Sequence, residues 1–408
     1  MTANKFDFLV VGAGIVGLTV AHELKGRFPS ARIGVMDKEA NAGIHASGRN
    51  SGVIHSGIYY SSDTLKAKVC AAGAKRMMDF SREHAIPCSK SGKVIVATSE
   101  KELPTVERLL RNASENGIRA WRIDEKDLRE IEPHAARGPA AIYSPDTAVI
   151  DSRAVVNRLT TLLEQQGVQF LWRHVFRKAG VPGEVITDQG KLSYGYIFNC
   201  AGAYADVVAR NFGLADDYAL VPFKGIYWKL RPEAEHLVRA NIYPVPDIDL
   251  PFLGVHLTRV ISGEVYVGPT AIPALGRENY GLLQGIRPLE AMGVSYRLAS
   301  MYLSNRCNFR RMAHMELSKY LKHHFLAAAQ RLLPSIVAED MIPTPKVGIR
   351  PQLVNLREGK LEMDYIFLHT DRSTHVLNAI SPAFTSSFAF AEMIVNSSSK
   401  VNLLTNLK

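Results

Sequence analysis

Residues 7–24, DFLVVGAGIVGLTVAHEL, join a short apolar run, a glycine-rich turn and a stretch with apolar residues at helical spacing. Gly12, Gly14 and Gly17 form a GxGxxG pattern at the turn. Such a turn between a strand and a helix lets backbone approach a pyrophosphate, and the free N–H groups of the helix N-terminus favour its charge. The stretch predicts a β-turn-α unit that binds a dinucleotide. An unrelated tight turn is the alternative.

The next apolar run, residues 31–39 (ARIGVMDKE), supports the dinucleotide hypothesis. It predicts a second strand that ends in Asp37, twenty residues after Gly17. An acid at this place accepts hydrogen bonds from a ribose. The residues that we expect to join the glycines in holding the cofactor here are Ile15, Val16, Asp37 and Lys38.

Residues 44–60, IHASGRNSGVIHSGIYY, distinguish between dinucleotides. An NAD-binding unit of this type continues with a regular second crossover, but here the second strand leads into a segment of glycines, serines, histidines and tyrosines. Small residues permit close backbone approach, and Arg49, Asn50 and Ser51 suit a pyrophosphate. The segment therefore favours FAD over NAD, with a solvated loop as the alternative.

The composition indicates an ordinary globular protein with two lobes. At 408 residues the chain exceeds the roughly 250–300 residues at which one core stops growing. It contains no apolar run of the roughly 20 residues that a membrane span needs. Four scattered cysteines without CxxC spacing predict a cytoplasmic protein without a metal site.

The formal charge of +10 calls for an anionic partner. One hypothesis is an anionic substrate or a phosphate-bearing cofactor, and another is peripheral contact with an anionic membrane surface. The third is a diffusely basic surface without a function. The basic segment at 305–312 is isolated, so we expect no nucleic-acid partner.

Several blocks resemble one family. GRNSGVIHSGIYY (48–60), NIYPVPD (241–247), PFLGVHLT (251–258) and VGP (267–269) are similar to the L-2-hydroxyglutarate dehydrogenases and oxidases, within the D-amino-acid-oxidase-like flavoproteins. The resemblance extends from about residue 6 to residue 396. It implies FAD as cofactor and oxidation of an L-2-hydroxy acid to its 2-oxo acid.

The implied fold class is α/β: a Rossmann-like FAD-binding lobe of the glutathione-reductase/D-amino-acid-oxidase type, and a second lobe on a mixed, largely antiparallel sheet. From about residue 219 to 280 the pattern changes from helix-strand alternation to successive strands, which supports the second lobe. We expect the FAD-binding lobe in residues 1–85, 151–215 and 341–396, the substrate lobe in 86–150 and 216–340, and a flexible tail in 397–408.

The resemblance also assigns cofactor contacts along the chain. The ADP half would be held by the glycine-rich turn and Asp37. Further contacts to the adenine, pyrophosphate, ribityl chain and flavin ring would come from Ser47, Arg49, Asn50, Ser51, Val175, Ala201, Gly202, Gly348, Arg350, Thr385 and Ser386.

The chemistry needs a base for the hydroxyl proton and a cation for the carboxylate. His55 is the first choice as base because it follows the flavin-binding segment, and His256 is the second; each could instead only orient a neighbour. Arg350 suits a bidentate clamp on the carboxylate, with an ion pair to flavin or at the surface as the alternative. The expected substrate contacts are His55, Tyr59, His256, Arg350 and Phe384. A further alternative has His45 tether the flavin covalently.

Some positions depart from the family pattern near the flavin and the facing lobe. They are Ala46, Lys224, Ile226, Thr270, Gly276, Pro351, Ile380 and Phe384. We therefore expect a substrate related to L-2-hydroxyglutarate, or another hydroxy or amino acid of a specialised pathway. A flavin-binding protein without catalysis and an electron-transfer component at a membrane surface are the other two hypotheses. The electron acceptor, O₂ or a quinone, stays open.

Overall fold

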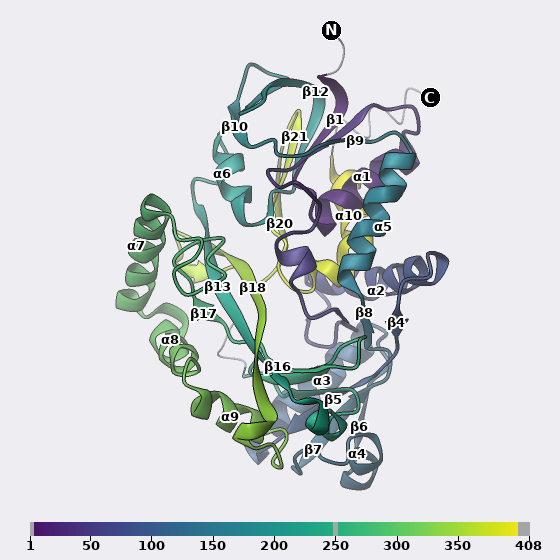
Figure 1. Cartoon of the computed structure of the whole chain (residues 1–408), viewed down its shortest axis with the longest axis vertical. Coiled ribbons are helices and arrows are strands. Elements are labelled where there is room, and N and C mark those ends of the chain that lie inside the picture. The colour runs from purple at the N-terminus through teal and green to yellow at the C-terminus, as the bar shows by residue number, and fades with distance from the viewer. Residues whose placement is uncertain (1–3, 248–251, 399–408) are drawn as a thin grey trace.

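The computed structural model describes residues 4–247 and 252–398 (Figure 1). Residues 399–408 of the predicted tail, and Pro251 of a family block, lie outside these ranges. Within the described residues the strands form two large sheets and a small one. The first large sheet contains β1 (Lys5–Val11), β2 (Ile33–Met36), β9 (Gln169–Leu171), β10 (Phe176–Ala179), β11 (Glu184–Thr187), β12 (Gly190–Asn199), β20 (Ile366–Thr370) and β21 (Ser373–Asn378).

The middle of this sheet is parallel. β1 lies between β2 and β12, with Val11 opposite Met36 on one side and Asn199 on the other. Parallel neighbours end at the same edge of a sheet, so the residues that follow these three strands come together there. This edge carries the glycine-rich turn and Asp37.

Four helices pack near this sheet in the upper part of Figure 1. They are α1 (Ile15–Arg27), α2 (Leu65–Glu83), α5 (Ser152–Gln165) and α10 (Ala383–Ser397). α1 is apolar in its first two turns and contacts both α5 and α10, which explains the burial of residues 15–21 and of Leu24. Its N-cap is Gly14, which has no side chain to accept the first N–H groups. Those N–H groups therefore remain open to other acceptors.

The second large sheet follows the order β19-β18-β13-β16-β15-β14-β5-β7-β6, with β17 also on β13. Its pairs are antiparallel except for β14 with β5, so the predicted mixed, largely antiparallel sheet is confirmed. The strands are β5 (Lys93–Ala97), β6 (Trp121–Ile123), β7 (Ala140–Ser144), β13 (Tyr218–Leu230), β14 (Asn241–Pro244), β15 (His256–Arg259), β16 (Val265–Gly268), β17 (Ile272–Pro273), β18 (Met341–Asn355) and β19 (Lys360–Leu361).

The longest strand pair, β13 with β18, extends toward the first sheet (Figure 1). The second sheet therefore continues to residue 361, beyond the predicted lobe boundary at 340. Helices α7 (Pro288–Ser304), α8 (Phe309–Ser318) and α9 (Lys322–Gln330) lie along its outer side. The remaining elements are α3 (Leu103–Glu115), α4 (Glu125–Ile131), α6 (Ala205–Arg210) and the small sheet of β3 (Val53–Ile54), β4 (Cys88–Ser89) and β8 (Ala148–Ile150).

A search of the described helices finds none with the length and apolarity needed to cross a membrane.

Candidate active site

A cavity of about 660 Å³ lies between the two large sheets, within the range of cofactor and ligand sites. One end meets the edge where β1, β2 and β12 finish, and its lining includes Gly12, Asp37 and Ala201. At the other end the lining includes His55 and His256. Both sheets therefore contribute to a single elongated site.

The glycine-rich turn has room only for glycine at two of its positions. Gly12 has a φ of +104°, and a Cβ there would lie 2.4 Å from the carbonyl oxygen of Cys200. A Cβ on Gly17 would lie 1.9 Å from the carbonyl oxygen of Gly12. Gly17 does not line the cavity. It lets α1 pack on the turn, while Gly12 and Gly14 present backbone to the cavity.

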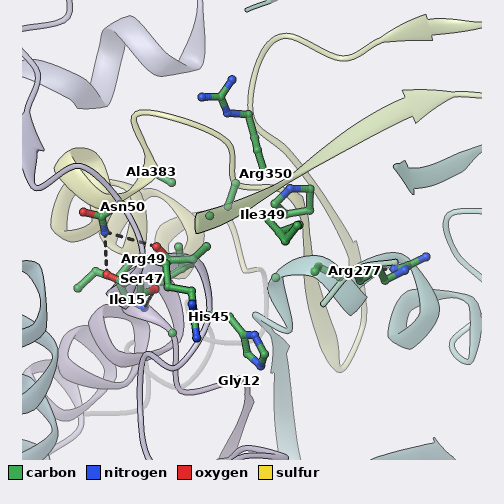
Figure 2. A pocket seen from close by; sticks show the side chains of 18 of the residues that line it. Gly12, Ile15, His45, Ser47, Arg49, Asn50, Arg277, Ile349, Arg350 and Ala383 are labelled. Atoms are coloured by element: carbon green, nitrogen blue, oxygen red, sulfur yellow. Dashed lines mark hydrogen bonds between the residues drawn. The ribbon is translucent and has the colours of Figure 1, made fainter. Parts of the chain in front are cut away.

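Ser47 connects the glycine-rich turn to residues 44–60, called the polar segment from here on. Its Oγ accepts the N–H of Ile15 at 2.8 Å, and its carbonyl oxygen accepts Nδ2 of Asn50 at 2.7 Å; both bonds are drawn in Figure 2. A Cβ on Gly14 would lie 3.3 Å from the same Oγ. Hydroxyl and backbone N–H groups at a helix N-terminus fit a pyrophosphate.

Asp37 faces the cavity from the end of β2. Its Oδ2 accepts the N–H of Ala13 at 2.7 Å, and Oδ1 accepts the N–H of Glu39 at 2.9 Å. Each carboxylate oxygen can accept more than one hydrogen bond, so both retain capacity for ribose hydroxyls.

A polar cluster surrounds Lys38. Its Nζ pairs with Glu39 and lies 2.7 Å from Glu278. Burial lowers the pKa of Lys38, but the hydrogen bonds to both carboxylates outweigh burial and the net shift is upward. Glu39, His45 and Glu278 place potential metal-ligand atoms within 4.8 Å of one another. The Lys38 ammonium already supplies a cation to this group.

Tyr280 was missed by the sequence reasoning. Its hydroxyl lies 2.7 Å from Nδ1 of His45, and its ring lies 4.2 Å beneath the guanidinium of Arg49. Nε2 of His45 lies 2.8 Å from Nζ of Lys38. Tyr280 is 235 residues from His45, so no local pattern signals this contact. It fixes two residues of the polar segment against the second lobe.

Most other predicted cofactor residues line the cavity. They are Ile15, Val16, Asn50, Ser51, Val175, Ala201, Gly202, Gly348, Arg350 and Thr385. Ser386 does not: its Oγ donates to the carbonyl oxygen of Pro382 and accepts the hydroxyl of Tyr365, both at 3.1 Å. A Cβ on Gly73 of α2 would lie 2.5 Å from Cα of Ser386. Ser386 therefore lies where α2 and α10 cross, away from the cavity.

One ring nitrogen of His55 is buried. Nδ1 is fully buried and has no hydrogen-bond partner among the described residues, while His55 as a residue lines the cavity. Burial lowers the pKa of His55 to about 3, and Lys93, His256 and Arg350 act in the same direction. The imidazole is therefore neutral at pH 7.

His256, on β15, has a fixed orientation. Its Nδ1 lies 2.9 Å from the carbonyl oxygen of Gly254, which fixes the hydrogen on Nδ1 and leaves a lone pair on Nε2. Burial lowers its pKa to about 4; the Gly254 hydrogen bond opposes this shift, and Arg350 adds to it. The Tyr243 ring lies 4.1 Å from the His256 ring.

Arg350 enters the same end of the cavity from β18. Its guanidinium lies 5.1 Å from the Phe252 ring and makes no hydrogen bond to the described residues. Burial lowers its pKa, yet a guanidinium keeps its charge in proteins. The acidic residues of the lining, Asp37, Glu39 and Glu278, belong to the cofactor turn and the Lys38 cluster. The substrate end therefore presents a cation that has no hydrogen bond to any described residue, beside two neutral imidazoles.

The departures from the family pattern divide into two groups. Ala46, Pro351, Ile380 and Phe384 line the cavity, as does Thr270. The Thr270 hydroxyl, however, accepts the N–H of Ile226 and donates to the carbonyl oxygen of Lys224, both at 3.1 Å, so it serves the strand.

Other expected positions, Ile226 among them, lie outside the cavity lining. Gly276 lies outside it, and a Cβ there would lie 2.9 Å from the carbonyl oxygen of Gly285. Lys224 is also outside, since its Nζ donates to the carbonyl oxygen of Gly281 at 2.6 Å. Tyr59, expected to contact substrate, is likewise not part of the lining. Because they do not line the cavity, these side chains cannot contact a substrate directly in this arrangement.

Residues 7–397 match the family described as FAD dependent oxidoreductase (DAO), so the chain belongs to that family. It is 35% identical over 430 residues to the mitochondrial L-2-hydroxyglutarate dehydrogenase of Nematostella vectensis, covering 97% of this chain and 90% of the relative. It is 36% identical over 394 residues to the L-2-hydroxyglutarate dehydrogenase of Indibacter alkaliphilus, covering 94% and 96%. The chain is thus an L-2-hydroxyglutarate dehydrogenase-like flavoenzyme.

Solved structures confirm the fold class. The FAD-bound L-alpha-glycerophosphate oxidase from Mycoplasma pneumoniae superimposes with a TM-score of 0.77 at 21% identity, covering 96% of this chain and 94% of that one. Glycine oxidase from Geobacillus kaustophilus gives 0.71 at 15% identity, covering 98% and 95%. The prediction of FAD as the cofactor is confirmed. The open backbone of Gly12 and Gly14, the acid at Asp37 and the cavity size all fit this group.

Proposed function

We propose that the enzyme oxidises an L-2-hydroxy acid, L-2-hydroxyglutarate or a related carboxylate, to the 2-oxo acid by hydride transfer to flavin N5. The observation that carries this proposal is the guanidinium of Arg350, without a hydrogen bond among the described residues, beside two neutral imidazoles, His55 and His256, at one end of the cavity. A hydroxy acid needs this combination of one carboxylate partner and one base.

Bound FAD supplies the hydride acceptor. Arg350 holds the α-carboxylate with two N–H donors and so fixes the orientation of the hydroxyl-bearing carbon. Nε2 of His55 takes the hydroxyl proton, because His55 lines the cavity, its other ring nitrogen is fully buried, and the ring is neutral at pH 7. The hydrogen bond to Gly254 orients His256. Its Nε2 lone pair can then accept a hydrogen bond from the same hydroxyl or from another donor group of the substrate.

A different hydroxy acid or an amino acid is the second candidate substrate. Phe384, Pro351 and Ala46 line the cavity at positions that depart from the family pattern, so these are the side chains that would accommodate a different substrate. Glycine oxidase, a structural neighbour, is named for an amino acid. Oxidation of a C–N bond requires the same hydride transfer and the same carboxylate clamp.

The test is to mix the purified holoenzyme with each candidate substrate in the absence of oxygen. Reduction of the flavin is monitored as loss of its visible absorption. The panel comprises both enantiomers of 2-hydroxyglutarate, other 2-hydroxy acids and amino acids. Bleaching by L-2-hydroxyglutarate supports the first substrate, and bleaching only by another acid supports the second. If no member of the panel bleaches the flavin, the proposed hydroxy-acid oxidation is wrong and a flavin-binding protein without this catalysis is favoured.

Contact with a membrane surface and a quinone acceptor form a further part of the proposal, with O₂ as the alternative acceptor. Leu289, Met292, Tyr296 and Leu303 are at least 70% exposed and recur at helical spacing on α7, which lies at the outer side of the molecule (Figure 1). Exposed arginines follow in residues 305–312. An apolar helix face flanked by basic residues suits an anionic bilayer surface. A cytoplasmic location stays part of this proposal, although the Nematostella relative is named as mitochondrial.

Vesicle sedimentation tests this contact. Wild-type protein should sediment with vesicles that contain anionic lipid and should remain in solution with neutral vesicles. The double variant Leu289→Ser with Met292→Ser should lose this binding, while the matched variant Val181→Ser, at another exposed apolar residue, should keep it. Equal sedimentation of wild type and double variant would remove α7 from the proposal.

A further inference from the structure

Residues 276–287, GRENYGLLQGIR, lie between β17 and α7 and form a compact loop, called the clasp loop from here on. A Cβ on Gly276 would lie 2.9 Å from the carbonyl oxygen of Gly285, so the two ends of the loop meet. Nδ2 of Asn279 donates to the carbonyl oxygen of Gln284 at 2.9 Å and so bridges the interior of the loop. A loop whose ends touch and which is packed by its own side chains is an ordered unit. The clasp loop therefore presents its outward side chains in fixed positions.

Arg277 and Glu278 connect the clasp loop to the segments that follow β12 and β2 of the first large sheet. Arg277 is buried and donates two hydrogen bonds to Asp206 of α6. Oε1 of Glu278 lies 2.7 Å from Nζ of Lys38 and accepts the hydroxyl of Tyr204 at 2.8 Å. Burial raises the pKa of Glu278, but the hydrogen bonds from Lys38 and Tyr204 outweigh burial and the net shift is downward. Glu278 is therefore a carboxylate at pH 7, and its ion pair with Lys38 joins the loop to the end of β2.

Tyr280 connects the clasp loop to the polar segment. Its hydroxyl lies 2.7 Å from Nδ1 of His45, and its ring lies 4.2 Å from the guanidinium of Arg49. The Tyr280 and His45 rings are stacked, with their centroids 6.0 Å apart. The hydroxyl and the ring of this one residue therefore make separate contacts to the polar segment.

The clasp loop faces the cofactor end of the cavity. Four of its side chains line the cavity: Arg277, Glu278, Tyr280 and Arg287. The segments that the loop contacts contain expected FAD contacts, namely Asp37, Lys38, Ser47, Arg49, Ala201 and Gly202. The loop and these expected contacts therefore belong to the same part of the cavity.

We propose that the clasp loop retains FAD, with Glu278 and Tyr280 as the positioning residues that hold the loop closed over the cofactor. Their partners Lys38 and His45 follow β2, on the opposite side of these contacts. FAD then leaves only after the loop has separated from the two partners. The proposal rests on FAD as the cofactor and does not depend on which acid the enzyme oxidises, so it can fail independently of the proposed function.

The first experiment measures how fast FAD dissociates from the holoenzyme. Glu278→Gln removes the charge that pairs with Lys38, and Tyr280→Phe removes the hydroxyl at His45 but keeps the ring. Each variant should raise the rate constant of FAD dissociation by about tenfold. The rate is measured as the rise of flavin fluorescence after dilution of the holoenzyme.

A second pair of residues supplies matched controls. Glu264 pairs with Lys229 at 2.7 Å and accepts the hydroxyl of Tyr266 at 3.1 Å, but neither Glu264 nor Tyr266 lines the cavity. Glu264→Gln and Tyr266→Phe should release FAD at the wild-type rate. Dissociation from Glu278→Gln and Tyr280→Phe at the wild-type rate would overturn the proposal. Failure of every protein to release FAD would overturn it too, because a covalent bond would then retain the cofactor.

Hydrogen exchange of the wild type gives a readout that needs neither a variant nor activity. If the loop closes over FAD, the bound cofactor and the closed loop stabilise each other. Addition of FAD to the apoprotein should therefore slow the exchange of backbone amides in residues 276–287 as well as in the glycine-rich turn, residues 12–17. A loop that only supports the fold would exchange equally fast with and without FAD. Slower exchange in the turn alone would overturn the proposal.

Discussion

Oδ2 of Asp37 accepts the backbone N–H of Ala13 at 2.7 Å, which ties the carboxylate at the end of β2 to the glycine-rich turn. The other oxygen accepts the N–H of Glu39 at 2.9 Å. The acid that we expect to hold the ribose therefore also fixes the backbone that we expect to hold the pyrophosphate. The expected ribose site and the expected pyrophosphate site are therefore joined by the hydrogen bonds of Asp37.

Asp37→Asn should weaken both functions at once. Asparagine offers one oxygen in place of two, so one backbone N–H loses its acceptor. We expect the free energy of unfolding to fall by about 1–3 kcal/mol. We also expect the Kd for FAD to rise by about tenfold or more, measured by fluorescence titration of the apoprotein. Asp151→Asn is the control: Asp151 caps α5, where asparagine caps equally well, and neither quantity should change. An unchanged Kd in Asp37→Asn would remove Asp37 from the ribose site.

The glycines of the turn should separate folding from binding. Gly17→Ala places a methyl group 1.9 Å from the Gly12 carbonyl oxygen, which backbone cannot accommodate, so we expect insoluble protein. Gly14→Ala meets only Ser47 Oγ at 3.3 Å and should fold. Its methyl group faces the cavity, however, and should weaken FAD binding. The measurements are soluble yield and FAD content after purification. A well-folded Gly17→Ala would contradict the geometry of the turn.

The cofactor end was predictable because its chemistry is local in sequence. Gly12, Gly17 and Asp37 belong to one β-turn-α-β unit, where parallel pairing of β1 and β2 brings the turn and the acid together. Residues 44–60 follow directly, and Ser47 meets the start of α1. The sequence spacing of these residues therefore predicts most of the arrangement at the cofactor end.

The substrate end was less predictable because it is assembled from strands far apart in sequence. Lys93 and Tyr243 meet because β5 pairs with β14, a contact that no motif signals. The resemblance indicated that Thr270 helps to select the substrate. Its hydroxyl is instead hydrogen-bonded to the strand backbone. Sequence comparison identifies a changed residue; whether that residue faces the cavity depends on side-chain direction.

The Arg277–Asp206 pair should be the ion pair on which stability depends most. Arg277 donates two hydrogen bonds to Asp206 and one to the carbonyl oxygen of Ala203, and both side chains are buried. Arg277→Met leaves a buried carboxylate with fewer partners and should cost about 3–5 kcal/mol in chemical denaturation. Arg129→Met, which breaks the exposed pair with Glu125, should cost less than about 1 kcal/mol. Equal effects in the two variants would refute this assignment.

The same pair predicts an acid dependence. Burial raises the pKa of Asp206, but the hydrogen bonds from Arg277 outweigh it and the net shift is downward. A carboxylate with a depressed pKa contributes stability above its unfolded value of about 3.9 and loses it as pH falls further. Wild-type Tm should therefore drop more steeply than that of Arg277→Met below about pH 4.

Arg350→Lys should impair substrate binding in spite of the conserved charge. A lysine ammonium cannot form the paired N–H contacts of a guanidinium with a carboxylate. We expect kcat/KM for the hydroxy acid to fall by about a hundredfold, mainly through KM, and the Kd of the 2-oxo acid product to rise in parallel. Arg177→Lys, at a residue of the lining near Val175, is the control and should leave both constants unchanged. An unaltered KM in Arg350→Lys would show that a different cationic residue binds the substrate carboxylate.

The two histidines should differ in catalysis and agree in acid stability. His55→Asn should lower kcat by about 10²–10⁴ because it removes the proposed base. His256→Asn should lower kcat less and raise KM, because Nε2 of His256 orients the substrate. A larger loss of kcat in His256→Asn would exchange the two roles. His323→Asn, at an exposed site on α9, should change neither constant.

The acid stability follows from the lowered pKa values of the same pair. Burial lowers the pKa of His55 to about 3 and that of His256 to about 4 in the folded chain, while an unfolded histidine titrates at about 6.5. Between the folded and unfolded values the unfolded chain binds more protons, so the wild type loses stability as pH falls from about 6.5 toward 4. Each asparagine variant should lose less stability over this range, and His323→Asn should follow the wild type. Parallel Tm curves for all four proteins would show that the two imidazoles are hydrated, and a hydrated His55 could be protonated near pH 6, where it would no longer serve as a base.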